Sequence, residues 1–332
     1  MKRLVYILLF IAIEQISFSQ QLPLYSQYLY NKFLINPAHA GSDGYTSFNI
    51  TARDQWIGYS GAPRTYSLSW QTRILKKSYK LKQNLFNRTI YRPKNDGKVG
   101  LGGYIFSDKN GLVQRTGFQV CYAYHLWLED FTQLSMGLAF TGYHFIINAR
   151  EINFEDPNEP WLNDNFRRGI FVPDADFGIY LLNPRYDLGF SAQQLFGAVA
   201  KIGENAYRNF SMDRHFYLFG SYIFSSGTKS ELQPSLLLKM SEQLRPQADI
   251  GLTYIFDQDY LVGLSYRTGG ALITNFRFRF IPSRVKKTTM FFGYSFDFTL
   301  NKIQRMTYGT HELTIALKLG DSARRYRWLD RY

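Results

Sequence analysis

The chain has 332 residues, of which 17% are aromatic and 20% are charged, and it contains a single cysteine, Cys121. One cysteine excludes an intrachain disulfide framework and a cysteine-based zinc site. The formal net charge is +13, but the basic residues are spread along the chain instead of forming the clustered patch that nucleic-acid binding requires. We therefore expect no nucleic-acid partner, and the many Tyr, Phe and Gly residues indicate a β-rich protein.

Residues 1–20, MKRLVYILLFIAIEQISFSQ, have the pattern of a secretory signal peptide. Lys2 and Arg3 form a basic start, residues 4–13 form an apolar run, and residues 17–19 supply small side chains for cleavage. The run is too short to span a bilayer as a helix. A buried N-terminal helix is the alternative interpretation.

Residues 21–44, QLPLYSQYLYNKFLINPAHAGSDG, are dense in aromatic residues but follow neither a helical nor a strand period. Four side chains of this segment are too apolar to remain in water: Tyr25, Tyr28, Tyr30 and Phe33. Irregular backbone is tolerated at membrane depth when protein surrounds it. If the strands that follow close into a barrel, the segment is expected to lie in the lumen or at its periplasmic mouth as a plug.

The rest of the chain alternates between apolar and polar residues with a period of two, as in strands with one face in each medium. In 290–300, for example, Phe292, Tyr294 and Phe296 fall on one face and Ser295 falls on the other. Such strands are expected at 45–57, 64–74, 98–107, 115–128, 131–147, 174–182, 185–195, 213–225, 229–241, 245–256, 259–268, 271–281, 287–300 and 310–319. These are fourteen strands, and single-chain bacterial barrels have an even number of strands. The first strand is therefore expected to pair with the last.

Two folds could use these strands. A soluble sandwich or barrel buries the apolar face in a core, whereas a membrane barrel turns it towards lipid and keeps polar groups inside. The strands are about ten residues long, which is enough to cross a bilayer at a tilt. No helical segment is available to cover so many Phe and Tyr residues. We therefore predict an all-β fold, a transmembrane antiparallel β-barrel of about fourteen strands in the cell outer membrane, spanning residues 45–319.

Charged residues lie on the strand faces opposite the aromatic residues. The predicted lumen charges are Arg53, Asp249, Arg267, Arg277, Arg279, Asp297 and Glu312. An arginine that faces lipid at the midplane costs about 2–4 kcal/mol, so the four arginines are expected to point inward and to meet acidic partners. On a soluble protein the same residues would simply face water.

The connections should alternate between the two ends of the barrel. The longest outward one, 148–173, carries four aromatic residues among acidic ones, and these are the predicted partner-binding residues: Phe154, Trp161, Phe166 and Phe171. Together with 196–212 this loop would form an outer platform, and a lid over the barrel mouth is the alternative. The basic loop 75–97 and the basic tail 320–332 are expected to face the periplasm, with a solvated linker as the alternative for the loop.

No catalytic constellation stands out in the sequence. The five histidines are scattered and show no HExxH or other ligand spacing. The run GKVGLGG at 97–103 resembles a phosphate loop, but it lacks the Lys-Ser/Thr ending and sits on a strand. Its small residues are expected to pack in the barrel wall. We predict no enzyme activity, no cofactor and no metal site.

The residues near the N-terminus carry a resemblance to a known family. The stretch at 21–44, followed by RDQWIGYSGAPRTYSLSW at 53–70, resembles the N-terminal signature of the PorP/SprF family of outer-membrane proteins, which are associated with type IX secretion and gliding motility. The matching residues are Tyr25, Ser26, Gln27, Tyr28, Asn31, Ile35, Asn36, Pro37, Ala38, Ala40, Gly41, Arg53, Gln55, Trp56, Gly58, Gly61, Ala62, Pro63 and Thr65. The chain departs from the family at His39, where an aromatic residue is usual, and in continuing beyond Leu319.

The resemblance implies an interaction protein, not an enzyme. Family members are linked to attaching secreted adhesins and other surface proteins through their C-terminal domains. They are also linked to tying the outer membrane to the periplasmic secretion motor through a peptidoglycan-associated partner. The rival function is a plugged channel for small or hydrophobic solutes. The lumen should distinguish the two, because a channel needs an open path that bulky or paired charged residues would block.

Overall fold

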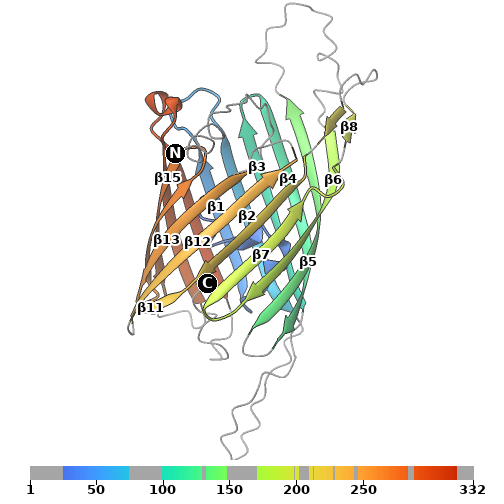
Figure 1. Cartoon of the computed structure of the whole chain (residues 1–332). Helices are drawn as coiled ribbons and strands as arrows, with labels where there is room; N and C mark the ends of the chain where they lie inside the picture. Colours follow the sequence, from blue (N-terminus) through green and yellow to red (C-terminus); the bar gives the residue numbers. More distant parts are fainter. Residues whose placement is uncertain are drawn as a thin grey trace, which may run out of the picture.

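The computed structural model describes residues 25–74, 99–128, 132–147, 170–197, 199–201, 209–211, 213–226, 229–242, 246–282 and 288–319. All of its strands except β8 and β9 form one large antiparallel sheet, drawn in Figure 1. Their bounds are β1 Thr46–Asp54, β2 Arg64–Ile74, β3 Val99–Asn110, β4 Val113–Trp127, β5 Gln133–Ile147, β6 Ile170–Leu182, β7 Tyr186–Gln193, β10 His215–Tyr222, β12 Ser230–Ser241, β13 Gln247–Phe256, β14 Tyr260–Arg267, β15 Ala271–Phe280, β16 Thr288–Thr299 and β17 Thr310–Leu319. The short β11, Phe224–Ser226, follows β10 along the same partner, β12.

The sheet closes into a ring of fourteen strands. β1 pairs with β17 from Thr46 opposite Leu319 to Asp54 opposite His311. β10 pairs with β7 on one side and with β12 on the other. Closure pairs the backbone groups that a sheet edge would expose, which is how a sheet satisfies them in lipid. The prediction of a fourteen-stranded antiparallel barrel, with the first strand paired to the last, is confirmed.

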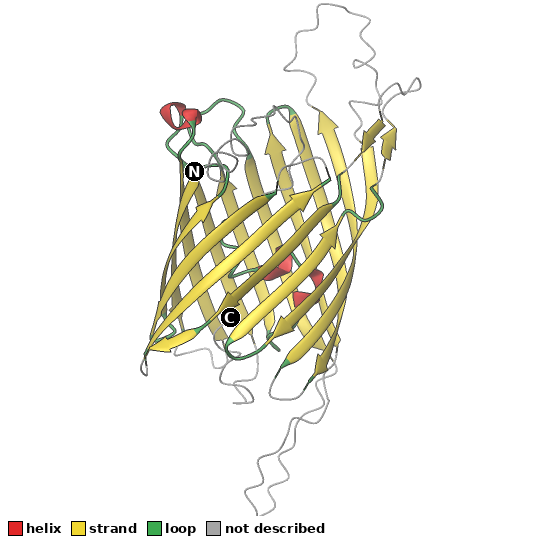
Figure 2. Cartoon of the chain, in the orientation of Figure 1, coloured by secondary structure: helices red, strands yellow, loops and turns green. Residues whose placement is uncertain are grey.

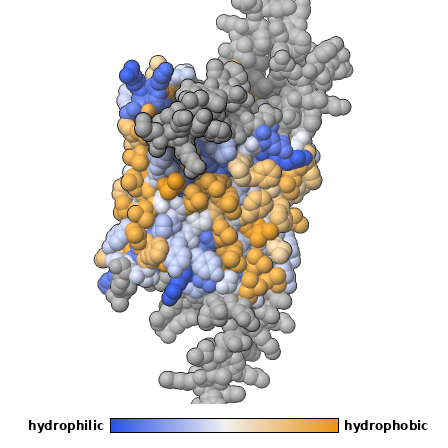
Figure 3. All heavy atoms as spheres, viewed as in Figure 1, coloured by the Kyte–Doolittle hydropathy of each residue, from blue (hydrophilic) through white to orange (hydrophobic). Residues whose placement is uncertain are grey.

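Alternate residues of each strand point out of the barrel and into its lumen. In β2, Tyr66, Leu68 and Trp70 are exposed, whereas Ser67 and Ser69 are buried. Figure 3 shows hydrophobic side chains over much of the outer wall. Apolar residues outside and polar residues inside are the pattern of a membrane barrel, the reverse of a soluble one. Among the described residues, no helix has the length and apolar character needed to cross a membrane.

Residues 25–45, here named the lumen segment, lie inside the ring. Two short 3-10 turns, η1 (Lys32–Leu34) and η2 (Pro37–His39), belong to this segment and are visible within the barrel in Figure 2. η2 contacts β4, β5 and β6. The chain then continues into β1.

The connections gather at two ends of the barrel. At the end here named the turn end, β1 begins, β17 ends, and the connections 183–185, 227–229 and 257–259 are short. The opposite loop end carries 55–63, 194–214 and 300–309.

Two loop-end elements were not expected from the sequence. They are the hairpin of β8 (Val199–Lys201) with β9 (Asn209–Ser211), and η5 (Lys302–Met306). Both are too short for a period to be read. The predicted signal peptide at 1–20, the basic loop 75–97 and the tail 320–332 lie outside the described residues.

Candidate functional site

The lumen segment follows an irregular path that its own turns define. Asn36 caps η2, because its Oδ1 accepts a hydrogen bond from Ala38 N at 2.9 Å. Pro37 follows at the first position of the turn, where its missing N–H has no partner to lose. Gly41 has φ +66°, a left-handed conformation that glycine adopts without strain. The Asn-Pro and Ala-Gly pairs of the sequence therefore shape the segment.

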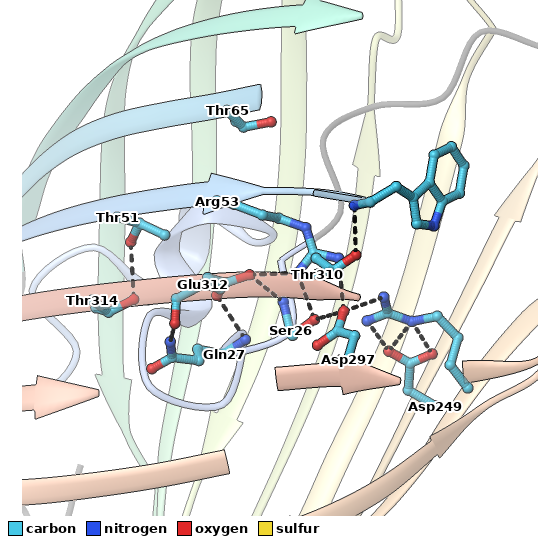
Figure 4. Close-up of polar contacts among 12 residues, drawn as sticks. Ser26, Gln27, Thr51, Arg53, Thr65, Asp249, Asp297, Thr310, Glu312 and Thr314 are labelled. Carbon is cyan, nitrogen blue, oxygen red and sulfur yellow. Dashed lines mark hydrogen bonds and ion pairs between the residues drawn. The ribbon is translucent and has the colours of Figure 1, made fainter. Parts of the chain in front are cut away.

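One buried carboxylate holds the start of the segment. Glu312 of β17 accepts hydrogen bonds from Ser26 N at 2.8 Å and from Gln27 N at 2.9 Å, one on each carboxylate oxygen. Gln27 Nε2 also donates to the backbone carbonyl of Glu312 at 2.9 Å. Figure 4 shows these groups pointing towards one another inside the barrel. Hydrogen bonds to a charged group are the stronger class, so this contact fixes the main chain of the segment.

Arg53 of β1 connects this carboxylate to the next strand. Its Nη1 lies 2.8 Å from Glu312 Oε2 and its Nη2 lies 2.8 Å from Asp297 Oδ2 on β16. Ser26 Oγ accepts from Arg53 Nη1 at 2.7 Å and donates to Asp297 Oδ2 at 2.6 Å. All of these side chains are buried. Removing one partner of a buried ion pair typically costs about 3–5 kcal/mol.

A second ion pair adjoins the first. Arg267 Nη2 of β14 lies 2.7 Å from Asp249 Oδ2 of β13, and Arg267 Nη1 lies 3.7 Å from Asp297 Oδ2. The ion pairs therefore link side chains from β13 to β1 in one network. Ser26 and Gln27 of the lumen segment are bound to this network.

Two further ion pairs join the segment to the wall. Lys32 Nζ lies 2.7 Å from Asp187 Oδ2 of β7, and both side chains are almost completely buried. Ser221 of β10 donates to the other carboxylate oxygen of Asp187. Near the turn end, Lys318 Nζ of β17 lies 3.0 Å from Asp43 Oδ2. A lysine is rarely this deeply buried unless it is paired, so the segment and the wall depend on each other for charge balance.

Polar wall side chains also bind the backbone of the segment. Ser191 Oγ and Gln193 Nε2, both on β7, donate to Ile35 O. Three strands further round the ring, His125 Nε2 of β4 lies 2.9 Å from Ala40 O. Buried backbone groups need such partners, and here the wall supplies what regular secondary structure would otherwise provide.

Four glycines of the wall make room for the segment. They lie on β3, β5, β6 and β16. A Cβ would lie 1.9 Å from Ala40 O at Gly100, 2.4 Å from Ala38 N at Gly137, 2.0 Å from Asn36 Oδ1 at Gly178 and 2.2 Å from Gln27 Oε1 at Gly293. These distances are far below van der Waals contact, so with any larger residue the segment, or at Gly293 the side chain of Gln27, has to shift.

Two small cavities lie beside the segment. A cavity of about 20 Å³ lies among Tyr25, Tyr217, Lys239 and Arg267, and a neighbouring one that also borders Tyr104 is of the same size. Each is about the room that one water molecule needs. In the part of the chain that the structure describes, no group of three or more His, Cys, Asp or Glu side chains could hold a metal ion. The arrangement is suited to holding a segment in place and offers no recognisable reactive centre among these residues.

The four aromatic residues singled out in the sequence all lie within the barrel. Phe33 is fully buried, with its ring edge-on to Tyr104 at a centroid distance of 6.1 Å. Tyr28 is buried as well, whereas Tyr25 and Tyr30 are half-buried.

The other two predicted lumen arginines make contacts apart from this network. Arg279 Nε lies 2.7 Å from Asp259 Oδ1, in the connection between β13 and β14. Arg277 has aromatic neighbours: its guanidinium lies 4.4 Å from the Tyr30 ring centroid and 4.8 Å from that of Phe291. Cations are stabilised over aromatic faces, so among the described residues Arg277 meets two rings in place of the carboxylate that we expected.

Three of the predicted partner-binding residues, Phe154, Trp161 and Phe166, lie outside the described residues. The fourth, Phe171, belongs to β6 and not to the expected loop, because the strand begins at Ile170 and continues through Pro173. Phe171 is exposed on the outer wall, where its ring stacks on Phe118.

Sequence reasoning missed several residues that bind the segment, among them Ser26, Lys32 and Asp187. A signal for Asp187 was present, since it is an acidic residue on the inward face of a strand. The inward glycines gave another signal, since glycine in a strand often marks the close approach of another backbone.

Comparison with family models agrees with a membrane protein. The family model described as type IX secretion system membrane protein PorP/SprF matches residues 17–317. Among solved structures, the chain is similar to the Ralstonia pickettii toluene transporter TbuX, with 11% identity over 86% of this chain and 92% of that one and a TM-score of 0.47. It is also similar to the Acinetobacter baumannii outer membrane protein Omp33 (8% identity, 83% and 99% covered, TM-score 0.40) and to a Pseudomonas aeruginosa FadL homologue (9% identity, 91% and 95% covered, TM-score 0.43). No curated protein matches the chain.

Proposed function

The chain belongs to the PorP/SprF family of type IX secretion system membrane proteins, and from that premise we propose that it is a docking barrel of the outer membrane, not a channel or an enzyme. Its proposed partners are secreted surface proteins, held through their C-terminal domains. The periplasmic motor complex, reached through a peptidoglycan-associated protein, is the other partner that the family suggests.

The observation that carries the proposal is the occupied lumen. The lumen segment is bound by Glu312, Asp187 and Lys318 from different strands. A channel plug that leaves during transport would have to break these contacts, and the buried ion pair of Lys32 with Asp187 alone costs about 3–5 kcal/mol if one partner is left unpaired. A barrel whose interior is filled in this way is left with its two ends as working surfaces.

We propose that the loop end faces the cell exterior and the turn end faces the periplasm. Short turns on the periplasmic side and longer loops outside are the usual asymmetry of outer-membrane barrels. Secreted proteins would then dock on the loop end, and periplasmic partners on the turn end.

The channel alternative is tested by conductance. The purified full-length barrel is inserted into planar lipid bilayers, with a porin of known conductance as the positive control. We expect no steady ion current. A stable open current from the unmodified protein would refute the docking proposal in favour of a channel.

Docking itself is tested in cells. A strain that lacks this chain is compared with the same strain carrying it back, and the secreted proteins retained on washed cells are measured by quantitative mass spectrometry. We expect particular surface proteins to move from the cells to the medium when the chain is absent. If the cell-bound set is unchanged while secretion continues, the chain has no role in retaining surface proteins.

A further inference from the structure

Four connections at the loop end form one continuous, ordered surface. These connections, 55–63, 111–112, 268–270 and 300–309, are here named the rim ledge. They join strands that are neighbours in the ring, from β14 through β17 and β1 to β4. η5, at the top left of Figure 1, is part of it.

Backbone hydrogen bonds tie the connections of the rim ledge to one another. Ile57 N donates to Gly309 O at 2.9 Å, and Tyr308 N donates back to Ile57 O at 2.8 Å. Gly111 N donates to Gly61 O at 2.9 Å, and Leu300 N donates to Gly270 O at 2.7 Å. Because these hydrogen bonds already order the connections, a partner that binds the rim ledge meets little entropic cost of ordering loops.

The rim ledge exposes large apolar side chains. Tyr308 is 80% exposed and Met306 is 67% exposed. Ile57, Tyr59 and Leu112 are exposed beside them. All five lie in connections beyond the strand ends, outside the rows of exposed residues that face outward along the strands. Exposed apolar residues gathered in one patch typically mark an interaction site.

The rim ledge also carries charged side chains. The only charged residues in the four connections are Lys302 and Arg305, both exposed on η5. Lys109, at the end of β3, is exposed as well. The exposed Arg64 at the start of β2 lies 3.9 Å from Asp54. In Figure 3 hydrophilic side chains cover this corner of the barrel. A surface with this excess of positive charge steers an acidic partner and repels a basic one.

We propose that the rim ledge docks an acidic protein surface that carries an aliphatic or aromatic side chain at its centre. The apolar group packs against Tyr308 and Met306, and carboxylates around it meet Lys302 and Arg305. This inference rests on the proposed docking function and deepens it, because it names the face and the chemistry of the partner.

The test uses full-length barrels in cells that lack the original chain. The ledge variants are Tyr308→Ser with Met306→Ser, and Lys302→Glu with Arg305→Glu. The matched control is Met240→Ser, an apolar residue that is 41% exposed near the loop end of β12, outside the rim ledge and outside the predicted 196–212 platform. Heat-modifiable mobility on gels confirms that each barrel is folded and present in equal amount.

We expect both ledge variants to lower the cell-bound amount of the retained proteins by about tenfold or more, as loss of a central contact residue does. The Met240→Ser control should retain them. A photo-crosslinking residue placed at position 308 should attach to one of these same proteins, at a peptide with an excess of Asp and Glu.

Three results overturn the inference. They are unchanged retention in both ledge variants, equal loss in the Met240→Ser control, and crosslinks from position 308 to lipopolysaccharide alone. The strain that lacks the chain distinguishes a failure of the rim-ledge inference from a failure of the proposed docking function. If that strain also retains every surface protein, docking itself fails. If it loses proteins that the ledge variants keep, only the rim ledge fails.

Discussion

Replacing Gly178 with alanine should displace the lumen segment from the barrel wall. A Cβ at this position would lie 2.0 Å from Asn36 Oδ1 and 3.0 Å from Pro37 Cδ. Asn36 is fully buried, and its side chain makes three hydrogen bonds: Nδ2 donates to Ile179 O at 2.9 Å and to Phe190 O at 3.1 Å, and Oδ1 accepts from Ala38 N at 2.9 Å. The added methyl group and the amide of Asn36 cannot occupy the same space.

The size of the effect follows from these contacts. Each lost hydrogen bond is worth about 0.5–1.5 kcal/mol net, and overpacking costs about 1–3 kcal/mol. Replacing glycine by alanine restores about 0.4–1 kcal/mol by restricting the unfolded chain. We expect Gly178→Ala to lower the free energy of unfolding by about 2–5 kcal/mol.

The assay is urea unfolding of the purified barrel in lipid vesicles, followed by tryptophan fluorescence and gel mobility. The control is Gly263→Ala, because Gly263 also faces the lumen but its nearest neighbours are the wall residues Thr253 and Asn275. The double variant Gly178→Ala with Asn36→Ala removes the group that the methyl would strike. In the Asn36→Ala background, Gly178→Ala should lower the free energy of unfolding by less than about 1 kcal/mol, because the effects of substitutions at contacting residues are not additive.

Equal stability of Gly178→Ala and Gly263→Ala would refute the reasoning, because the close approach of Asn36 would then have no energetic weight. Strictly additive effects in the double variant would refute it as well.

Three further changes test the rest of the site. Glu312→Ala removes the acceptor for two backbone donors and the partner of Arg53, so it should destabilise the barrel by about 3–5 kcal/mol, whereas Glu242→Ala, which breaks the exposed pair with Arg214, should cost at most about 1 kcal/mol in the same unfolding assay. Lys32→Met leaves Asp187 buried without its cation, and adding Asp187→Asn should recover part of the lost stability; a double variant less stable than the single one would contradict the pairing. Cys121 is 2% exposed, so a maleimide dye should label it only after unfolding, and rapid labelling of the folded barrel would show that its surroundings are open.

The strands were predictable because a wall between lipid and a polar lumen imposes a period of two on nearly every segment. That pattern gives the face of a residue but not its height along the barrel or its partner across the lumen. Arg53 and Glu312 could be placed inside, and their pairing follows from the register of β1 with β17. Lys32 with Asp187 could not be foreseen, because the two are separated by 155 positions and the segment has no period of its own.

The glycines at 100, 137, 178 and 293 illustrate the same limit. Each could be recognised as a small residue on a strand. Only the fold shows that all of them face one segment, with distances that leave no room for a methyl group. The rim ledge could not be predicted from the sequence either, because its hydrogen bonds join connections that are far apart along the chain.

The hydrogen bonds between the first described residues and the last strand set an order for assembly. Ser26 and its acceptor Glu312 are 286 positions apart. Such distant contacts form late in folding, because the entropic cost of closing the intervening loop precedes the favourable free energy of the contact. A nascent chain that has not yet added β17 lacks Glu312, so it has no acceptor for the main-chain donors of Ser26 and Gln27. Full seating of the segment therefore marks a finished barrel, and an incomplete one keeps its aromatic N-terminal stretch available to chaperones and proteases of the envelope.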